Sequence, residues 1–205
     1  MHISRPLDLK GSLAILSMKM NLPNKLTTLR MFLVPVFAIV ILVGGSENYT
    51  TRIIAEVIFI SASLTDMLDG KIARKYNLIT DYGKFMDPLA DKLLVCTAMI
   101  CLMSFGQLPA WVLIIIIARE FIISGFRLIA ADNGRVIAAS YWGKFKTVFQ
   151  MAMVIVMILH IRVEPFAQFF MVLETLLMYI AVILTVVSLI DYLVKNRDVL
   201  KEQKV

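Results

Sequence analysis

The stretch DMLDGKIARKYNLITDYGKFMDPLAD, residues 66–91, holds two aspartate pairs between two long apolar segments. The pairs are Asp66 with Asp69 and Asp87 with Asp91. A carboxylate inside a membrane-spanning segment costs about 2.5–3.5 kcal/mol on insertion scales, so such a group usually persists for a functional reason. Four carboxylates cannot all stay ionised close together without a compensating cation. The stretch therefore predicts a divalent-metal site at a membrane surface.

The spacing within each pair supports this interpretation. Asp66 and Asp69 are three residues apart and Asp87 and Asp91 are four apart, so each pair shares one face of a helix. Every ligand offered is a hard oxygen, and no His or Cys lies in the stretch, which favours Mg²⁺ or Mn²⁺ over zinc or copper. One pair alone would fit helix caps or surface anchors equally well. Two pairs with glycine and arginine between them favour the metal site.

The composition predicts an all-α, polytopic membrane protein. The chain has 205 residues, of which 60% are hydrophobic, and its mean hydropathy is +0.82. Apolar stretches long enough to cross a bilayer recur along it. We predict six transmembrane helices, over residues 26–43, 53–74, 82–103, 110–131, 145–161 and 166–194.

The basic residues predict the orientation of these spans. Of the 21 Lys and Arg residues, 15 lie in the terminal segments or near the second and fourth connections, whereas the other connections carry only Arg52 and Arg162. Cytoplasmic segments are enriched in Lys and Arg, so both termini and the aspartate pairs are expected at the cytoplasmic face. This asymmetry also explains the net charge of +6, and we expect no nucleic-acid partner.

Residues 1–20 fall outside the predicted membrane domain, residues 21–205. Their apolar stretch at 13–16 is too short for a signal peptide. We interpret them as a leader, native or added to the natural chain, with a short interfacial helix over residues 9–20 as the alternative. Cys96 and Cys101 lie five residues apart in one apolar segment, a spacing that a helix cannot bridge, so both are expected to be free thiols.

Four basic residues fall inside the predicted spans: Arg30, Lys92, Arg119 and Arg127. Each needs a partner or an aqueous cavity. Arg127 follows Arg119 by two helical turns and lies near the same face, and Lys144 and Lys146 open the next span. Arg119, Arg127, Lys144 and Lys146 are expected to form a cationic pocket near the metal. A metal for one phosphate and a cationic pocket for another are typical of phosphoryl transfer.

Two of these cations also have a simpler structural explanation. Arg119 is followed by Glu120, but adjacent helical residues do not face each other, which disfavours an ion pair. Arg127 has the alternative of extending to the membrane interface. Lys144 follows Gly143 at a predicted helix start, where exposed amide N–H groups favour anions.

The pattern Asp66-x2-Asp69-Gly70-x2-Ala73-Arg74-x8-Gly83-x3-Asp87-x3-Asp91 resembles the full signature of the CDP-alcohol phosphatidyltransferase family. Residues 21–30, 119–127 and 139–151 resemble the branch of that family that uses glycerol 3-phosphate. The resemblance covers residues 20 to 195 and implies six transmembrane helices and a homodimer in the bacterial cytoplasmic membrane.

The resemblance also implies a reaction. The sn-1 hydroxyl of glycerol 3-phosphate attacks CDP-diacylglycerol, giving phosphatidylglycerophosphate and CMP, with Mg²⁺ or Mn²⁺, in two ions, as the cofactor. The expected ligands are Asp66, Asp69 and Asp87, and Asp91 is expected to be the base for the incoming hydroxyl and also a ligand. These two roles compete, because a metal lowers the pKa of a ligating carboxylate.

The expected substrate contacts divide into two groups. The CDP-lipid group is Asn24, Thr28, Asp66, Asp69, Gly70, Ala73 and Arg74, and the acceptor-phosphate group is Arg119, Arg127, Lys144 and Lys146. Small residues such as Gly70 and Ala73 let a nucleotide lie against the helix backbone, although they also mark helix packing. Asn24, Thr27 and Thr28 are also expected to cap the first span.

Two rival functions remain at this level. A sibling enzyme with another acceptor, such as serine or inositol phosphate, would share the signature, but the cationic pocket disfavours serine. A divalent-cation transporter would need acidic groups near the membrane midplane. Here the aspartate pairs lie at the ends of their spans, and Arg119 near a midplane would repel a cation.

Overall fold

The computed structural model describes residues 21–75, 81–132, 134, 137 and 140–197, without the side chains at 23, 66–75, 81–85, 87–88 and 132. This part of the chain forms six α-helices and no strand. The helices are α2 (Leu22–Gly44), α3 (Tyr49–Lys75), α4 (Asp81–Ser104), α5 (Ala110–Asp132), α6 (Tyr141–Leu159) and α7 (Ala167–Lys195). The all-α prediction is confirmed for these residues, and the predicted leader, residues 1–20, lies outside them.

The start of α2 differs from the prediction. The helix begins at Leu22, after Asn21, so the polar residues expected to cap it lie inside its first turns. Thr28 Oγ1 donates to the carbonyl of Asn24 at 2.9 Å, a bond within the helix. The predicted capping role of Asn24, Thr27 and Thr28 is therefore wrong, because Asn21 is the N-cap and proline at the next positions favours a helix start there, about one turn before the predicted span.

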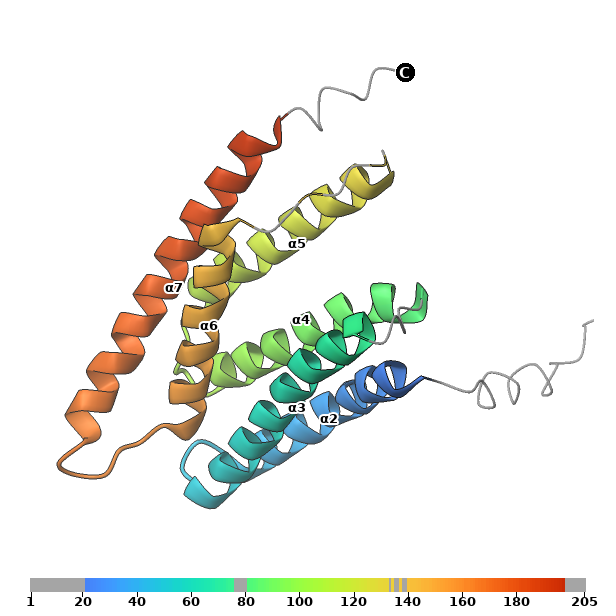
Figure 1. The fold of residues 1–205 in the computed structure, drawn as a ribbon. Helices are drawn as coiled ribbons and strands as arrows, with labels where there is room; N and C mark the ends of the chain where they lie inside the picture. Colours follow the sequence, from blue (N-terminus) through green and yellow to red (C-terminus); the bar gives the residue numbers. More distant parts are fainter. Residues whose placement is uncertain (1–20, 76–80, 133, 135–136, 138–139, 198–205) are drawn as a thin grey trace, which may run out of the picture.

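Consecutive helices run in opposite directions, as Figure 1 shows. α2 packs mainly along α3 and α4, and α7 packs mainly along α6 and α5. α6 also contacts α3 and α4 and so joins the two groups. The fold therefore brings α4, α5, α6 and α7 around one region in which the predicted cationic residues lie.

Three of the six helices are long and apolar enough to cross a membrane: Asn24–Gly44 of α2, Tyr141–Leu159 (α6) and Ala167–Lys195 (α7). The other three helices carry more charged residues, such as Arg52 and Glu56 in α3 and Arg119 and Glu120 in α5. α5 nevertheless presents large apolar side chains outward, among them Phe121 and Leu128. Exposed apolar faces of this kind are expected where a helix contacts lipid.

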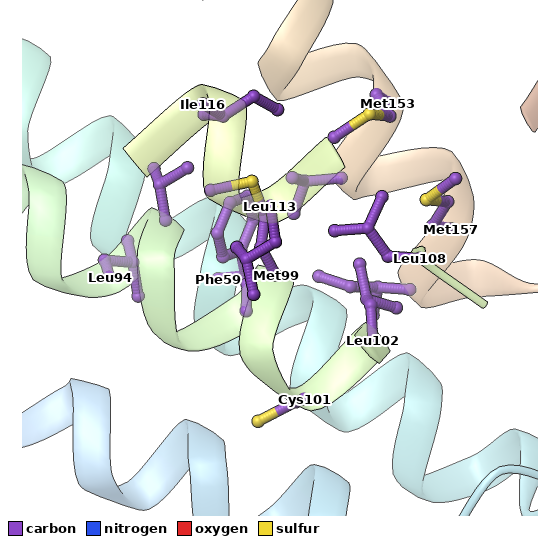
Figure 2. Packing of buried hydrophobic residues seen from close by; sticks show 14 of the residues in the cluster. Phe59, Leu94, Met99, Cys101, Leu102, Leu108, Leu113, Ile116, Met153 and Met157 are labelled. Atoms are coloured by element: carbon purple, nitrogen blue, oxygen red, sulfur yellow. The ribbon is translucent and has the colours of Figure 1, made fainter. Parts of the chain in front are cut away.

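The interior between α3, α4, α5 and α6 is filled by aliphatic, aromatic and sulfur-containing side chains (Figure 2). Phe59, Met99 and Met153 are fully buried there. Methionine fills irregular gaps between helices because its side chain is flexible and polarisable. Cys96 and Cys101 are free thiols, as predicted. This packing fixes the relative positions of α4, α5 and α6, which carry most of the polar residues described next.

Candidate active site

A cavity of about 270 Å³ lies between α4, α5, α6 and α7. Its lining residues are mostly charged or polar: Asp91, Lys92, Arg119, Glu120, Arg127, Ser140, Gly143, Lys144, Thr147 and Tyr192. The wall from α4 supplies Asp91, the last aspartate of the signature, and its side chain is exposed. The structure thus brings this carboxylate into the same cavity as three of the four cations predicted to bind a phosphate.

Arg119 comes from the middle of α5 and is only 8% exposed. Its Nη1 donates to Glu120 Oε1 at 3.0 Å, and its Nη2 donates to Ser188 Oγ. Its Nε is buried and has no hydrogen-bond partner among the described residues. The expectation that Arg119 and Glu120 do not pair is wrong, because the long arginine side chain curls back to its neighbour although the two Cβ atoms point apart. The ion pair and the cavity position coexist.

Lys146 differs from the other predicted cations. It is 2% exposed, and its Nζ donates to Glu120 Oε1. It lines a smaller pocket of about 50 Å³, which also contains Asp91, Cys96 and Gln150, and it is not among the residues that line the larger cavity. The four predicted cations are therefore divided between two adjoining pockets, which share Asp91, Lys92, Glu120 and Thr147, and Lys146 lines the smaller one. Residue 146 lies one turn or less from Lys144 but on another helix face, so the two lysines point to different neighbours.

Lys144 and Arg127 complete the cationic wall. α6 begins after Ser140, whose Oγ accepts a hydrogen bond from Gly143 N at 3.2 Å, so Lys144 does follow a helix start. The Lys144 Nζ lies 5.4 Å from the ring centre of Tyr141, and the Arg127 guanidinium lies 5.9 Å from that of Tyr192. Such cation–π contacts hold a charge without neutralising it. Neither contact supplies a negative charge, so both side chains can attract an anion in the cavity.

Two residues of α7 at the site, Ser188 and Tyr192, were not predicted from the sequence. Tyr192 is 3% exposed and lines the cavity, yet its hydroxyl has no hydrogen-bond partner among the residues that the structure describes. Ser188, one turn earlier, is fully buried against Arg119. The available signal was a serine and a tyrosine four residues apart in a mostly apolar helix, a spacing that gives them one face.

The start of α2 lies beside the helix that carries the first aspartate pair. Asn24, Thr27 and Arg30 are buried. Arg30 Nε donates to the carbonyl of Ala62 in α3 at 3.2 Å, one turn before Asp66 in the sequence. The intramembrane charge of Arg30 thus has a partner, as predicted. This contact brings the polar face of α2 next to the end of α3 that holds the signature.

The predicted metal ligands are described only in part. The side chains of Asp66, Asp69, Ala73, Arg74 and Asp87 lie outside the described residues, and of Gly70 only the place in the helix is described. Among the described residues there is no cluster of three or more His, Cys, Asp or Glu that could hold a metal ion. The backbone does carry the two pairs on α3 and α4, two helices that contact each other. Four carboxylates on adjacent helices are a donor set that fits a hard divalent cation.

The comparisons with known proteins agree with one another. Residues 20–187 match the family model of the CDP-alcohol phosphatidyltransferases. The chain is 44% identical over 190 residues to the CDP-diacylglycerol–glycerol-3-phosphate 3-phosphatidyltransferase of Bacillus subtilis, covering 88% of this chain and 97% of that protein. It is 38% identical to the enzymes of the same name from Rickettsia typhi (84% and 94% covered) and Haemophilus influenzae (86% and 93% covered).

Proposed function

This chain belongs to the CDP-alcohol phosphatidyltransferase family, and we propose that it transfers the phosphatidyl group of CDP-diacylglycerol to glycerol 3-phosphate. The products are phosphatidylglycerophosphate and CMP. The observation that carries the proposal is the juxtaposition of Asp91 with Arg119, Arg127 and Lys144 in one cavity. A carboxylate that can accept a proton and three cations that can hold a phosphate are what an attack by a phosphorylated alcohol requires.

In the proposed reaction, the sn-1 oxygen of glycerol 3-phosphate bonds to the β-phosphorus of CDP-diacylglycerol. The bond from this phosphorus to the CMP oxygen breaks, and the hydroxyl proton passes to Asp91. The exposed position of Asp91 in the cavity wall lets a hydroxyl reach it. Proton transfer to a positioned base of this kind contributes about 10²–10⁴-fold to a rate.

The acceptor phosphate is assigned to the cationic wall of the cavity. Arg119 has its Nε–H unpaired among the described residues, and Arg127 and Lys144 rest on aromatic rings. Lys146 takes part indirectly in this proposal, because it shares Glu120 with Arg119. One carboxylate between two cations leaves a net positive charge beside the cavity, and this favours a phosphomonoester over a neutral alcohol such as serine.

The CDP-lipid is assigned to the ends of α2 and α3, with Asn24, Thr28, Gly70, Ala73 and Arg74 as its contacts. Asp66, Asp69 and Asp87, together with Asp91, are the proposed ligands of Mg²⁺ or Mn²⁺, as two ions. When bound, such cations would neutralise the diphosphate and stabilise the charge on the CMP leaving oxygen. Asn24 is buried at the start of α2, close in sequence to the Arg30 contact that joins α2 to α3.

The setting of the proposed reaction is the cytoplasmic face of a bacterial cell membrane. CDP, glycerol 3-phosphate and the metal are water-soluble, whereas the acyl chains need lipid, so the cavity has to meet both. The charge asymmetry of the connections supports cytoplasmic termini. We extend the proposal to six membrane spans in residues 21–205 and to a homodimer, by analogy with the family.

A parallel acceptor assay in detergent tests the proposal. The protein is given CDP-diacylglycerol and Mg²⁺ with glycerol 3-phosphate, inositol phosphate or serine, and CMP release and the lipid product are measured. Only glycerol 3-phosphate should support rapid turnover. EDTA should abolish it, and Mg²⁺ or Mn²⁺ should restore it. Preference for inositol phosphate would replace the substrate but keep the cationic pocket, and preference for serine would overturn the pocket as well.

A further inference from the structure

The guanidinium of Arg119 is held from two helices. Within α5, Nη1 donates to Glu120 Oε1 at 3.0 Å. From α7, the hydroxyl of Ser188 accepts a hydrogen bond from Nη2. An arginine side chain loses rotamer entropy when it is fixed. Because two hydrogen bonds, to residues of α5 and α7, already fix the guanidinium of Arg119, it is oriented before any ligand binds.

A third helix closes on the same corner. A Cβ built on Gly143 of α6 would lie 3.3 Å from Arg119 Nη2 and 3.8 Å from Ser188 Oγ. The missing side chain at Gly143 thus leaves room for the guanidinium beside α6. α5, α6 and α7 therefore meet at the Arg119–Ser188 hydrogen bond, and the bond fixes where the positive charge lies relative to the helix start that carries Lys144.

Ser188, the hydrogen-bond partner of Arg119 from α7, is neutral and therefore leaves the charge of the guanidinium in place. Glu120 already accepts from both Arg119 and Lys146, so one carboxylate serves two cations. A second carboxylate at position 188 would cancel the remaining positive charge. A serine hydroxyl orients the guanidinium without neutralising it, and a charged hydrogen-bond donor of this kind is left to attract an anion.

From these contacts we propose that Ser188 is a positioning residue for the acceptor phosphate, acting through Arg119. This inference rests on the proposed role of Arg119 in binding that phosphate. Ser188 is fully buried and is not among the described residues that line the cavity, so it does not meet the ligand itself. Its hydroxyl holds Nη2 in the orientation that turns the charge of Arg119 toward the cavity.

The helix offers a matched control. Thr185 lies on the same face of α7, one turn before Ser188, and is equally buried. Its hydroxyl donates to the carbonyl of Ala181 in its own helix at 2.6 Å. Thr185→Ala thus removes a buried hydroxyl from α7 that makes no bond to Arg119. Its effect shows what the loss of a buried hydroxyl from this helix costs when only packing is changed.

The experiment is a double-mutant cycle on the full-length protein, with steady-state kinetics in detergent for each substrate. Ser188→Ala should raise the KM for glycerol 3-phosphate about 3- to 10-fold and leave the KM for CDP-diacylglycerol unchanged. Thr185→Ala should change neither KM. In an Arg119→Ala background, Ser188→Ala should have no further effect, because the group through which it acts is gone.

The possible outcomes separate the two ideas. If Arg119→Ala leaves the acceptor KM unchanged, the proposed phosphate role of Arg119 is wrong. If Arg119→Ala raises this KM but Ser188→Ala does not, or if the two effects multiply in the double variant, the role of Ser188 is overturned while that of Arg119 stands. Should Ser188→Ala not fold, Ser188→Cys keeps the side-chain size with a weaker acceptor and is read against the same expectations.

Discussion

Arg52 and Arg119 are both buried arginines inside helices, and they lie near opposite ends of α6. Arg52 contacts the carboxyl end of α6, where the carbonyls of Met157 and Ile158 accept from its Nη1 at 3.2 and 2.9 Å. Arg119 lies against Gly143 near the amino end of the same helix. The donors of Arg52 are directed to the chain itself, whereas Arg119 keeps an unpaired Nε beside a cavity.

Arg52 belongs to a network that ties three connections of the bundle together. Its Nε donates to the carbonyl of Ser46 at 2.7 Å and its Nη2 to Gln107 Oε1 at 3.2 Å. The side-chain amide of Gln107 then meets His160 Nδ1, and Glu174 accepts two bonds from Arg162, at 3.0 and 2.6 Å. We call Arg52, Gln107, His160, Arg162 and Glu174 the distal network.

The difference between the two ends separates a structural charge from a functional one. A charged residue inside an apolar helix needs a partner, and this need can be met by the fold or by a ligand. In the distal network the fold meets it, with carbonyls that the ends of helices leave unpaired. Around Arg119 the fold supplies partners for Nη1 and Nη2 but, among the described residues, none for Nε. An arginine that lines a cavity and keeps one donor unpaired among the described residues is thus the better candidate for binding.

The same carboxylate-to-amide change should have opposite effects at the two ends. Asp91→Asn should lower kcat by about 10²–10⁴-fold, because the proposed base is lost, with little change in the thermal midpoint since Asp91 is exposed. Glu174→Gln should leave kcat unchanged and lower the thermal midpoint, because it weakens the bidentate pair with Arg162. Steady-state rates and thermal unfolding in detergent measure both.

The binding of CMP decides which role Asp91 has. Asp69→Asn is expected to weaken CMP binding through the metal, whereas Asp91→Asn should retain it. Equal loss of CMP binding in both variants would mean that Asp91 is chiefly a ligand and not the base.

Removal of Arg119 should affect substrate binding, whereas removal of Arg52 should affect stability. Arg119→Ala should raise the KM for glycerol 3-phosphate about 10- to 150-fold, the value of a charge-assisted phosphate contact of about 1.5–3 kcal/mol. Arg119→Lys should restore only part of the affinity, because lysine lacks the planar fork. The KM for CDP-diacylglycerol should move little.

Arg52→Ala is the counterpart at the other end. It should leave the acceptor KM unchanged and lower the free energy of unfolding by about 3 kcal/mol, since several buried carbonyls lose their donor. Chemical denaturation in mild detergent measures this loss. An Arg119→Ala protein with a normal acceptor KM and an equal loss of stability would erase the distinction between the two arginines.

Glu56 sharpens the comparison from within α3. It lies one turn after Arg52 and is buried, but neither carboxylate oxygen has a hydrogen-bond partner among the residues described. An unpaired buried polar group costs about 1–3 kcal/mol, so Glu56→Leu should raise the free energy of unfolding by an amount of this order. Glu56→Gln serves as the control and should change it less. A clear loss of stability in both variants would reveal a role for the carboxyl.

The smallest expected effect is a pH dependence of the distal network. Burial, followed by the charges of Arg162 and Arg52, lowers the pKa of His160 below the 6.5 of an unperturbed histidine, although Glu174 opposes this shift. Gln107 also requires an unprotonated Nδ1, because its Oε1 faces Arg52 and its amide nitrogen must face His160. The unfolded chain therefore takes up the proton more readily than the folded one.

Stability from this source is complete above pH 6.5 and is lost as the pH falls through the lowered pKa of His160. The thermal midpoint should drop by no more than about 4 °C between pH 7.5 and pH 5.5. His160→Gln, which cannot be protonated, should reduce this drop. An unchanged pH dependence in His160→Gln would assign it to other groups.

Several features of the fold and the site were predictable from local sequence. Each of the six helices was predicted within about four residues of its ends, because long apolar runs and helix-breaking connections are local properties. Arg119, Arg127, Lys144 and Lys146 were predicted to share a pocket because charges in or beside apolar spans are rare; the first three line one cavity, and Lys146 lines an adjoining pocket. The predicted metal ligands Asp66, Asp69 and Asp87 stay a prediction, since their side chains lie outside the described residues.

The sequence by itself determined the helices, the family and the cationic character of the site. Hydropathy, the spacing of the signature and charges within apolar runs are all properties of short continuous segments. Only the tertiary structure decided how the charges are paired. Ser188 and Arg119 are 69 residues apart, and Lys146 and Glu120 are 26 apart, so no local pattern joins them. Which donor stays unpaired depends on how α5, α6 and α7 pack, and helix packing is a property of whole faces meeting across the bundle.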